Sequence, residues 1–385
     1  MAATRALPIA RETTTMLSGS LAQAADWLGR VGLKKTQQPA LIGLDISSSA
    51  VKLLEISRAG RNHQIDRYRI EPLPRDAVVD GNLNQIEAVA DAIRRAWQAL
   101  DTTTRDVAVA LPTTMAIYRK ILVPMAQSQE LEALIESEAQ QYIPFALDEV
   151  NLDYQVLGPA AHNPDDLEVM LCAARKEKVD ERVAAVEMAG LKAAVVDVDA
   201  FATLTAFEQI QLQLPEQGMN QTFALFDIGA TKIYCNVIRN GQQLYYREQA
   251  FGGQQLTRDI QRRYGIPYEE AERGKCSMSL PDGYEAELLH PFVDSLAQEI
   301  QRALQFFYTT VSVSQYLRVD YLLLAGGSSL LPGLDDAVSA RTQISTMIAN
   351  PFTTMVQSAA IRPKALLLDA PSLLVACGLA LRRFD

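Results

Sequence analysis

The sequence is poor in histidine, and its few cysteines form no Cys-x-x-Cys pair. The residues concerned are His63, His162, His290, Cys172, Cys235, Cys276 and Cys377. A zinc site or a His-based catalytic triad needs several such side chains at fixed spacing, so we expect neither. Each cysteine stands among apolar or small residues, which favours buried, reduced thiols over disulfides.

Long apolar runs and an excess of basic residues are also lacking. No stretch of about 18 apolar residues occurs, so we expect no transmembrane helix. The first ten residues lack the charged and apolar regions of a signal peptide, and we expect a protein of the reducing cytoplasm. The formal net charge of −10, without a basic stripe, argues against a dedicated nucleic-acid binder.

What the chain has is ordinary globular composition over a considerable length. Its 385 residues, 48% of them apolar, exceed what one hydrophobic core usually organises. Residues 1–38 differ, because Thr, Ser, Ala and Gln dominate them. Their amphipathic piece is Leu17–Leu33, followed by Lys34 and Lys35. We expect a flexible tail here, with a short interfacial helix on anionic lipid as the alternative.

Two segments in different halves of the chain share one pattern: an apolar strand, an aspartate, a turn of small residues and a second apolar strand. They are Leu41–Ile56 and Phe223–Ile238, and their alignment places Asp45 with Asp227. One such hairpin is weak evidence, since Asp and Ser are common in any turn. Two at matched places indicate an internal duplication and hence two lobes.

The residue types of the two turns suit phosphate binding. Small residues let phosphate oxygens approach backbone N–H groups closely, and hydroxyls add further donors. The lysines could supply positive charge or simply be solvated, and the aspartates would hold Mg²⁺ mainly through water. The predicted phosphate-binding residues are Asp45, Ser47, Ser48, Ser49, Lys52, Asp227, Gly229, Ala230, Thr231 and Lys232.

A third motif, Leu322–Leu334, reads as a strand, a glycine turn and the start of a helix. In this order the three motifs resemble those of the actin–hexokinase–heat-shock-70 ATPase superfamily, whose third motif is an adenosine loop. The resemblance implies an α/β, two-lobed, actin-like (ribonuclease-H-like) fold with ATP and Mg²⁺ as cofactors. Gly326, Gly327 and Ser328 would then lie against the nucleotide.

Two further positions match this superfamily. Glu272 and Lys275 have the spacing of a helix that touches the adenosine in heat-shock-70-like members, although an exposed i, i+3 ion pair is an equal alternative. An acidic residue is expected between the lobes, and Asp199 has a better register for it than Asp197. The residues implied for Mg²⁺, mostly through water, are Asp45, Asp199 and Asp227. Since no residue is an evident base, the catalytic residues are unassigned and any ATPase activity is expected to be slow.

An insertion at 125–195 resembles subdomain 1C of the FtsA branch, but the chain lacks the terminal amphipathic helix of FtsA. From residue 40 onward it resembles the PilM family of type IV pilus assembly proteins, whose members start closer to the first strand. The segments that carry this resemblance are Gly43–Glu55, Glu138–Phe145, Asp148–Gln155, Val196–Ala202, Asn350–Phe352 and Asp369–Ser372. It implies a groove for the cytoplasmic N-terminal segment of PilN, walled by Tyr142, Ile143 and Phe145, with core packing of these residues as the alternative.

The expected organisation follows from these motifs. After the tail at 1–38 we expect a first lobe at 39–124 (1A), the 1C-like insertion at 125–195, and a connecting helix at 196–215. The second lobe is then expected at 221–252 and 312–364 (2A), around a helical 2B-like part at 253–311, with residues 365–385 returning to the first lobe.

The leading functional expectation is an ATP-dependent cytoplasmic adaptor. The resemblance implies partners in the PilN/PilO membrane complex and the pilus motor ATPases, without a membrane span of its own. A sugar or acetate kinase is one alternative, but no second glycine-rich substrate loop is seen. A filament-forming protein like FtsA or MreB is the other, and self-association stays open.

Overall fold

The computed structural model describes residues 40–126, 128–160, 163, 165–311 and 317–384, so the expected tail at 1–38 lies outside them. The strands are β1 Ile42–Ile46, β2 Ala50–Ala59, β3 Asn62–Pro72, β4 Val78–Val79, β5 Asn82–Leu83, β6 Asp106–Leu111, β7 Ala116–Pro124, β8 Val150–Pro159, β9 Asp166–Arg175, β10 Lys192–Val198, β11 Thr222–Ile228, β12 Ile233–Arg239, β13 Gln242–Gln249, β14 Tyr321–Ala325, β15 Ser345–Ile348 and β16 Val356–Gln357. The helices are α2 Ile86–Leu100, α3 Ser128–Tyr142, α4 Lys176–Met188, α5 Asp199–Gln211, α6 Gln254–Tyr264, α7 Tyr268–Ser277, α8 His290–Thr310, α9 Leu334–Thr342, α10 Pro363–Asp369 and α11 Leu374–Leu381.

Two sheets with the same topology form the centre of the molecule. The first-lobe sheet runs β10-β6-β1-β2-β3-β16 and the second-lobe sheet runs β13-β12-β11-β14-β15. In each, three antiparallel strands of a double hairpin continue into two parallel strands. The duplication predicted from the two Asp hairpins is therefore confirmed at the level of whole sheets, and so is the two-lobed, actin-like α/β fold.

The hairpin at the start of the second lobe shows why these sequences fold as they do. Both turn residues between β12 and β13, Asn240 and Gly241, have positive φ (50° and 72°). Two such residues make a turn whose twist matches that of the flanking strands, and Asn-Gly is the favoured pair. Along β11 the apolar side chains are buried on both faces, as expected of a central strand covered by helices on each side.

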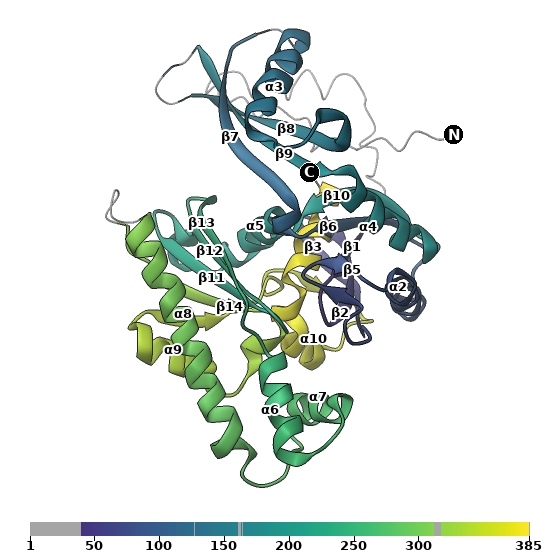
Figure 1. Ribbon diagram of the computed structural model, residues 1–385, viewed down its shortest axis with the longest axis vertical. Coiled ribbons are helices and arrows are strands. Elements are labelled where there is room, and N and C mark those ends of the chain that lie inside the picture. The colour runs from purple at the N-terminus through teal and green to yellow at the C-terminus, as the bar shows by residue number, and fades with distance from the viewer. Residues whose placement is uncertain (1–39, 127, 161–162, 164, 312–316, 385) are drawn as a thin grey trace.

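A separate three-stranded sheet, β7-β9-β8, rises from the first lobe and is covered by α3 (Figure 1). The expected boundaries of the insertion, 125–195, need correction. Strand β7 pairs along its length with β9 of this sheet, whereas β10 pairs with β6 of the first lobe. Helix α4 packs on α2, with Ala185 and Val186 in the first-lobe core. The inserted unit is thus residues 116–175.

Helices α5 and α11 cross between the two lobes, where both are buried. A Cβ at Gly378 of α11 would lie 1.7 Å from the Ala202 carbonyl oxygen of α5, so the crossing requires a glycine. A Cβ at Gly43 of β1 would likewise lie 2.1 Å from the Ala376 oxygen. Glycine at both places lets α11 approach the first-lobe sheet and α5 at backbone contact distance.

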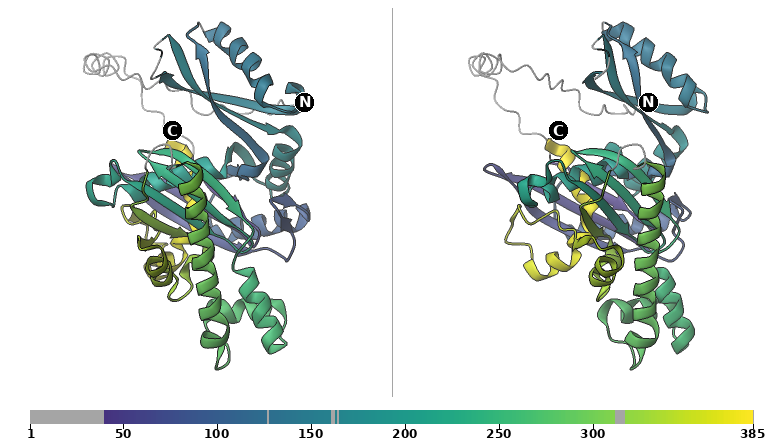
Figure 2. Two further views of the ribbon diagram at one scale, coloured as in Figure 1. Left: turned by 60° about the vertical axis from the view of Figure 1, so that its left-hand side comes forward. Right: turned by 90° about the vertical axis from the view of Figure 1, so that its left-hand side faces the viewer.

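The second lobe carries its helices on the outer face of its sheet and at its far end. Helices α6, α8 and α9 cover one core with β11, β12 and β14. Figure 2 shows α6 and α7 at the opposite end of the molecule from the inserted sheet and α3. The two lobes' sheets therefore lie between two outlying units, the inserted sheet with α3 on one side and the helices α6 and α7 on the other.

The residues Pro363–Phe384 are long and apolar enough to cross a membrane, but 67% of the apolar 18-residue window within them is buried inside the fold. Leu373, Leu374, Ala376 and Cys377 are almost fully buried in the core between the lobes, whereas Leu367 and Leu368 are 63% exposed. Burial of this kind is typical of the core helices of a folded protein.

Local structure sets the bounds of two helices. Helix α2 begins at Ile86, because Leu83 before it pairs with Val78 in the hairpin β4–β5. Helix α11 covers only Leu374–Leu381, and the separate helix α10 precedes it. The expectation of buried thiols holds for Cys235 and Cys377, is only partly met by Cys172, and is wrong for Cys276, which is exposed; all four are free.

Candidate functional site

The two turns predicted to bind phosphate meet across the cleft. The Thr231 hydroxyl donates to the Ser48 hydroxyl oxygen at 3.4 Å, joining residues that are 183 positions apart. Ser47 is used within its own turn, since its backbone N–H and its hydroxyl both donate to the Ala50 oxygen. Ser49 is exposed at the tip. The sequence therefore brings both turns to one place, with hydroxyls at the contact.

Asp45 and Lys52 form an ion pair inside the cleft, with 2.9 Å between the Asp45 Oδ2 and the Lys52 Nζ. They face each other in the β1–β2 ladder, whereas the matching position opposite Asp227 in β11–β12 is Tyr234. Burial lowers the pKa of Lys52, but the carboxylates of Asp45 and Asp227 outweigh it and raise the net value. Lys52 is thus a fixed cation between the two aspartates.

Asp199, at the first turn of α5, completes an acidic group in the cleft. It accepts hydrogen bonds from the Thr113 backbone N–H at 2.9 Å and from the Thr113 hydroxyl. Burial raises the pKa of Asp199 to about 7, the Thr113 hydrogen bonds oppose this, and the charges of Asp45 and Asp227 add to it. Burial also raises the pKa of Asp227 to about 6, against the opposing charge of Lys52. Both carboxyls are therefore easier to protonate than a solvated aspartate.

Asp197 and Asp199, the two candidates for an acidic residue between the lobes, have different partners. Asp197 Oδ2 accepts a hydrogen bond from Arg382 Nε at 2.6 Å, and its side chain is 3% exposed. It ties β10 to the 3₁₀ turn after α11. Asp199 instead interacts with the charges of both turns. Asp199 stays the predicted acidic residue between the lobes.

The structure places Lys232 differently from the expectation that it faces phosphate. Its Nζ lies 3.3 Å from Asp80 Oδ1 of the first lobe and also contacts Glu248 of β13. These carboxylates raise its pKa although burial lowers it. Lys232 carries an interlobe ion pair because its neighbours on β13 and on hairpin β4–β5 are acidic.

The glycine turn after β14 lies directly against the second Asp turn. Gly326 has φ 82°, and a Cβ there would come within 2.4 Å of both Asp227 Oδ1 and the Ile228 oxygen. The Ser328 hydroxyl donates to the Gly229 oxygen at 3.1 Å. At Gly327 a Cβ would meet no atom of the described residues within 4 Å. Gly326 is required by packing, whereas Gly327 leaves open space beside it.

Helices α6 and α7 bring a polar cluster to this glycine turn. Lys275 Nζ donates to Glu272 Oε2 at 2.7 Å, to the Thr257 hydroxyl at 2.9 Å and to the Gly253 oxygen at 3.3 Å. A Cβ at Gly253 would lie 2.4 Å from Ser328 Oγ. The i, i+3 ion pair offered as an alternative is present, and the pair also lies beside the glycine turn.

The residue types at the converging turns suit a nucleotide with bound magnesium. In the part of the chain that the structure describes, no three His, Cys, Asp or Glu side chains lie close enough to form an ion cage. Magnesium usually keeps several waters and takes only one or two carboxylates besides phosphate oxygens. Asp45 and Asp227, one from each turn, suit that role, and the open space beside Gly327 leaves room for a ligand to approach the backbone.

The predicted groove residues separate into two kinds. Ile143 is 5% exposed and packs in the core of the inserted unit, so its expected place in a groove wall is wrong. Tyr142 and Phe145 are 37% and 38% exposed. Arg119 lies over the Tyr142 ring at 5.3 Å, and Arg175 lies over Phe145 at the same distance. An exposed surface of aromatic rings and guanidinium groups results.

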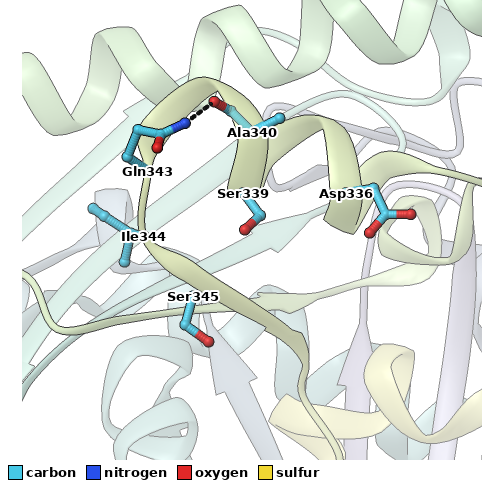
Figure 3. Close-up of a pocket in the computed structure, with 6 residues that line it drawn as sticks. All are labelled: Asp336, Ser339, Ala340, Gln343, Ile344 and Ser345. Carbon is cyan, nitrogen blue, oxygen red and sulfur yellow. Dashed lines mark hydrogen bonds between the residues drawn. The ribbon is translucent and has the colours of Figure 1, made fainter.

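Figure 3 shows a different hollow, of about 530 Å³, between α9 and the edge strand β15. It is lined by Asp336, Ser339, Ala340, Gln343, Ile344 and Ser345. None of the residues predicted from the three motifs lines it. We locate the candidate site at the converging turns, where glycines, hydroxyls and carboxylates meet, although contact between the turns narrows that cleft.

Sequence reasoning missed several residues of the site. Arg182 of α4, 2% exposed, reaches under the first turn and donates to the Ile46 oxygen at 3.4 Å. Thr113 holds Asp199, and Gly253 donates its N–H to the Gly229 oxygen at 3.1 Å. The adjacent glycines at 252 and 253 were a usable signal, whereas one arginine in a helix and one threonine after a proline carry none.

Comparison with known proteins gives one family match and two similar solved structures. Residues 43–384 match the family model described as type IV pilus assembly protein PilM. A solved structure described as a PilM-PilN type IV pilus biogenesis complex is similar with a TM-score of 0.74 and 29% identity, covering 90% of this chain and 99% of that one. The ethanolamine utilization protein EutJ from Carboxydothermus hydrogenoformans is similar with a TM-score of 0.54 and 15% identity, covering 93% and 95%. The second likeness concerns the fold alone.

Proposed function

Because the chain belongs to the family of type IV pilus assembly proteins PilM, we propose that it is an ATP-binding adaptor of the pilus machinery. It binds the cytoplasmic N-terminal segment of PilN and links the inner-membrane PilN/PilO platform to the pilus motor ATPases. It works in the cytoplasm and is held at the inner membrane by these partners.

One observation supports the nucleotide part above the others: the two Asp turns and the glycine turn converge on a single cleft. Thr231 touches Ser48 across it, and Gly326 packs on Asp227. Backbone N–H groups and hydroxyls of the two turns would cradle the β- and γ-phosphates from both lobes. Magnesium would offset the phosphate charge near Asp45 and Asp227. The adenosine would lie on Gly327, beside Glu272 and Lys275.

Turnover is proposed to be slow. Asp199 is the carboxyl between the lobes, but Thr113 already occupies its Oδ1 with two hydrogen bonds. These hydrogen bonds occupy the oxygen that a general base would use to take a proton from water. The site suits holding ATP and closing the lobes more than rapid hydrolysis.

The partner assignment rests on the similar solved structure, which is described as a complex of PilM with PilN. In this chain the exposed rings of Tyr142 and Phe145, each under an arginine, offer apolar contact together with positive charge. An extended peptide with apolar and acidic side chains would match such a surface.

The test is calorimetric titration of the full-length protein with a synthetic N-terminal PilN peptide, with and without AMPPNP and Mg²⁺. We expect saturable binding that Tyr142→Ala and Phe145→Ala weaken about tenfold or more, as loss of an aromatic anchor does. The control Leu212→Ala removes an apolar side chain, 51% exposed, from the residue that follows α5. Absence of peptide binding in both states refutes the adaptor, and absence of AMPPNP binding refutes the nucleotide site.

A further inference from the structure

The short hairpin β4–β5 lies where three parts of the molecule meet. Its tip, Asp80–Gly81, has positive φ at both residues (50° and 82°), the geometry of a tight two-residue turn. The tip is closely packed: a Cβ at Gly81 would lie 2.7 Å from the Pro112 side chain and 3.2 Å from that of Met115. Pro112 and Met115 lie in the connection from β6 to β7, the strand by which the chain enters the inserted sheet.

Toward the second lobe the hairpin segment makes two contacts. Asp80 pairs with Lys232, which follows the second Asp turn directly and is only 15% exposed. Arg75, in the residues just before β4, lies over the ring of Tyr268 in the first turn of α7, with 5.4 Å between its guanidinium carbon and the ring centre. These contacts cross the cleft, so a change in the lobe angle must stretch or break them.

Toward the inserted sheet the hairpin is held by a buried cation. Arg182 Nη2 donates to the Gly81 oxygen at 2.7 Å, while its Nη1 reaches the Ile46 oxygen of the first Asp turn. Arg182 belongs to α4, which begins at Lys176, directly after β9 ends at Arg175. The guanidinium thus ties the hairpin tip to the helix by which the chain leaves the inserted sheet.

Both covalent connections between the first lobe and the inserted sheet are therefore in contact with one hairpin tip, and the same tip is paired with the second lobe. We propose that hairpin β4–β5 is a mechanical link that couples lobe closure to the inserted sheet, through Asp80–Lys232 on one side and Gly81–Arg182 on the other. Arg182 and Asp80 are positioning residues in this link. The regulatory part rests on the proposed function, in which nucleotide closes the lobes and the inserted sheet binds a peptide.

The size of the effect is limited by the exposed end of the link. An ion pair with one exposed partner stabilises weakly, so breaking Asp80–Lys232 should change local opening equilibria by about two- to fivefold. Allosteric couplings of that order are common. If nucleotide changes the affinity for the peptide by a given factor, the peptide must change the affinity for nucleotide by the same factor.

The experiment is hydrogen–deuterium exchange on full-length wild type, Asp80→Asn and Arg182→Lys, first without nucleotide. Asp80→Asn alters only an exposed side chain and should fold, whereas Arg182→Lys keeps the buried charge but shortens its reach. We expect both to accelerate exchange in α4 and at the start of β7, Asp80→Asn by about two- to fivefold. The control Glu87→Gln removes a charge from the exposed side of α2 and should change neither. Unchanged α4 exchange in Asp80→Asn overturns the link.

The second arm adds AMPPNP and Mg²⁺, with nucleotide binding measured directly on the same samples. In wild type, nucleotide should slow exchange in α7 and in α4 together. In Asp80→Asn it should still slow exchange in α7 but affect α4 at most half as strongly. Equal slowing of α4 in both proteins refutes the coupling. A wild type that binds no AMPPNP refutes the proposed function instead, while the nucleotide-free arm still decides whether the link exists.

Discussion

The adjacent glycines at 326 and 327 allow the site to be tested by a pair of matched substitutions. Gly326 has φ 82° and ψ 163°, and its Cβ would lie 2.4 Å from Asp227 Oδ1 and from the Ile228 oxygen. Gly327 faces open space among the described residues. Gly326→Ala therefore perturbs the fold and Asp227 together, whereas Gly327→Ala adds one methyl group where nucleotide is proposed to lie.

The magnitudes follow from these two environments. A residue other than glycine in the conformation of Gly326 costs about 1–3 kcal/mol, and overpacking costs about 1–3 kcal/mol more. Gly326→Ala should thus lower the free energy of unfolding by about 2–6 kcal/mol. Gly327→Ala should leave it within about 0.5 kcal/mol, the usual range for a surface change. Its effect should fall on nucleotide affinity, which we expect to drop about tenfold or more.

Two assays separate these effects. Urea unfolding followed by circular dichroism gives stability, and calorimetric titration with AMPPNP and Mg²⁺ gives affinity. If Gly326→Ala unfolds at the same urea concentration as wild type, the packing of the glycine turn on Asp227 is wrong. If Gly327→Ala binds AMPPNP as wild type does, the nucleotide does not lie on this turn.

Three further outcomes are expected. The folded-state pKa of Asp199, about 7, lies above its ordinary 3.8, so the folded protein binds more protons than the unfolded one and loses stability as pH rises from about 4 to 7. Urea unfolding of wild type and of Asp199→Asn should show this loss in wild type alone. The loss is at most about 4 kcal/mol, because each pH unit is worth about 1.4 kcal/mol. A loss on falling pH instead would contradict it. Gly378→Ala should lower the free energy of unfolding in urea by about 3 kcal/mol or more, because the added methyl group would collide with α5. If the variant is as stable as wild type, α11 and α5 do not cross as closely as described. Asp197→Asn should lower the free energy of unfolding by about 3 kcal/mol in thermal unfolding, because it removes the largely buried ion pair with Arg382. A smaller loss than that caused by the surface substitution Glu87→Gln would contradict a structural role for Asp197.

The sequence was most informative where local patterns repeat. An apolar strand, an aspartate and a turn of small residues specify a hairpin without reference to the rest of the chain, so Leu41–Ile56 and Phe223–Ile238 could be recognised. The glycine turn at 326–327 followed from its order after them. The contact of Thr231 with Ser48 could be expected only from the duplication, and the structure contains it.

The rest depended on distant packing. Lys232 was expected at phosphate because it follows the turn, but Asp80 and Glu248, far away in the chain, attract it. Hairpin β4–β5 has strands of two residues each, too short for any periodicity. Arg182 becomes a buried donor only because α4 packs under the first turn, and Ile143 is buried because α3 ends against the inserted sheet.

The closeness of α11 to β1 has a consequence for how the protein is made. The first-lobe sheet forms early in the chain, yet Gly43 packs on Ala376, and Tyr68 hydrogen-bonds to Asp369, 301 residues later. During synthesis, at about 5–20 residues per second, the apolar face of β1 and β2 waits roughly 15–60 s for its covering helix. Over that interval the apolar side chains of β1 and β2 lack the helix that covers them in the folded protein.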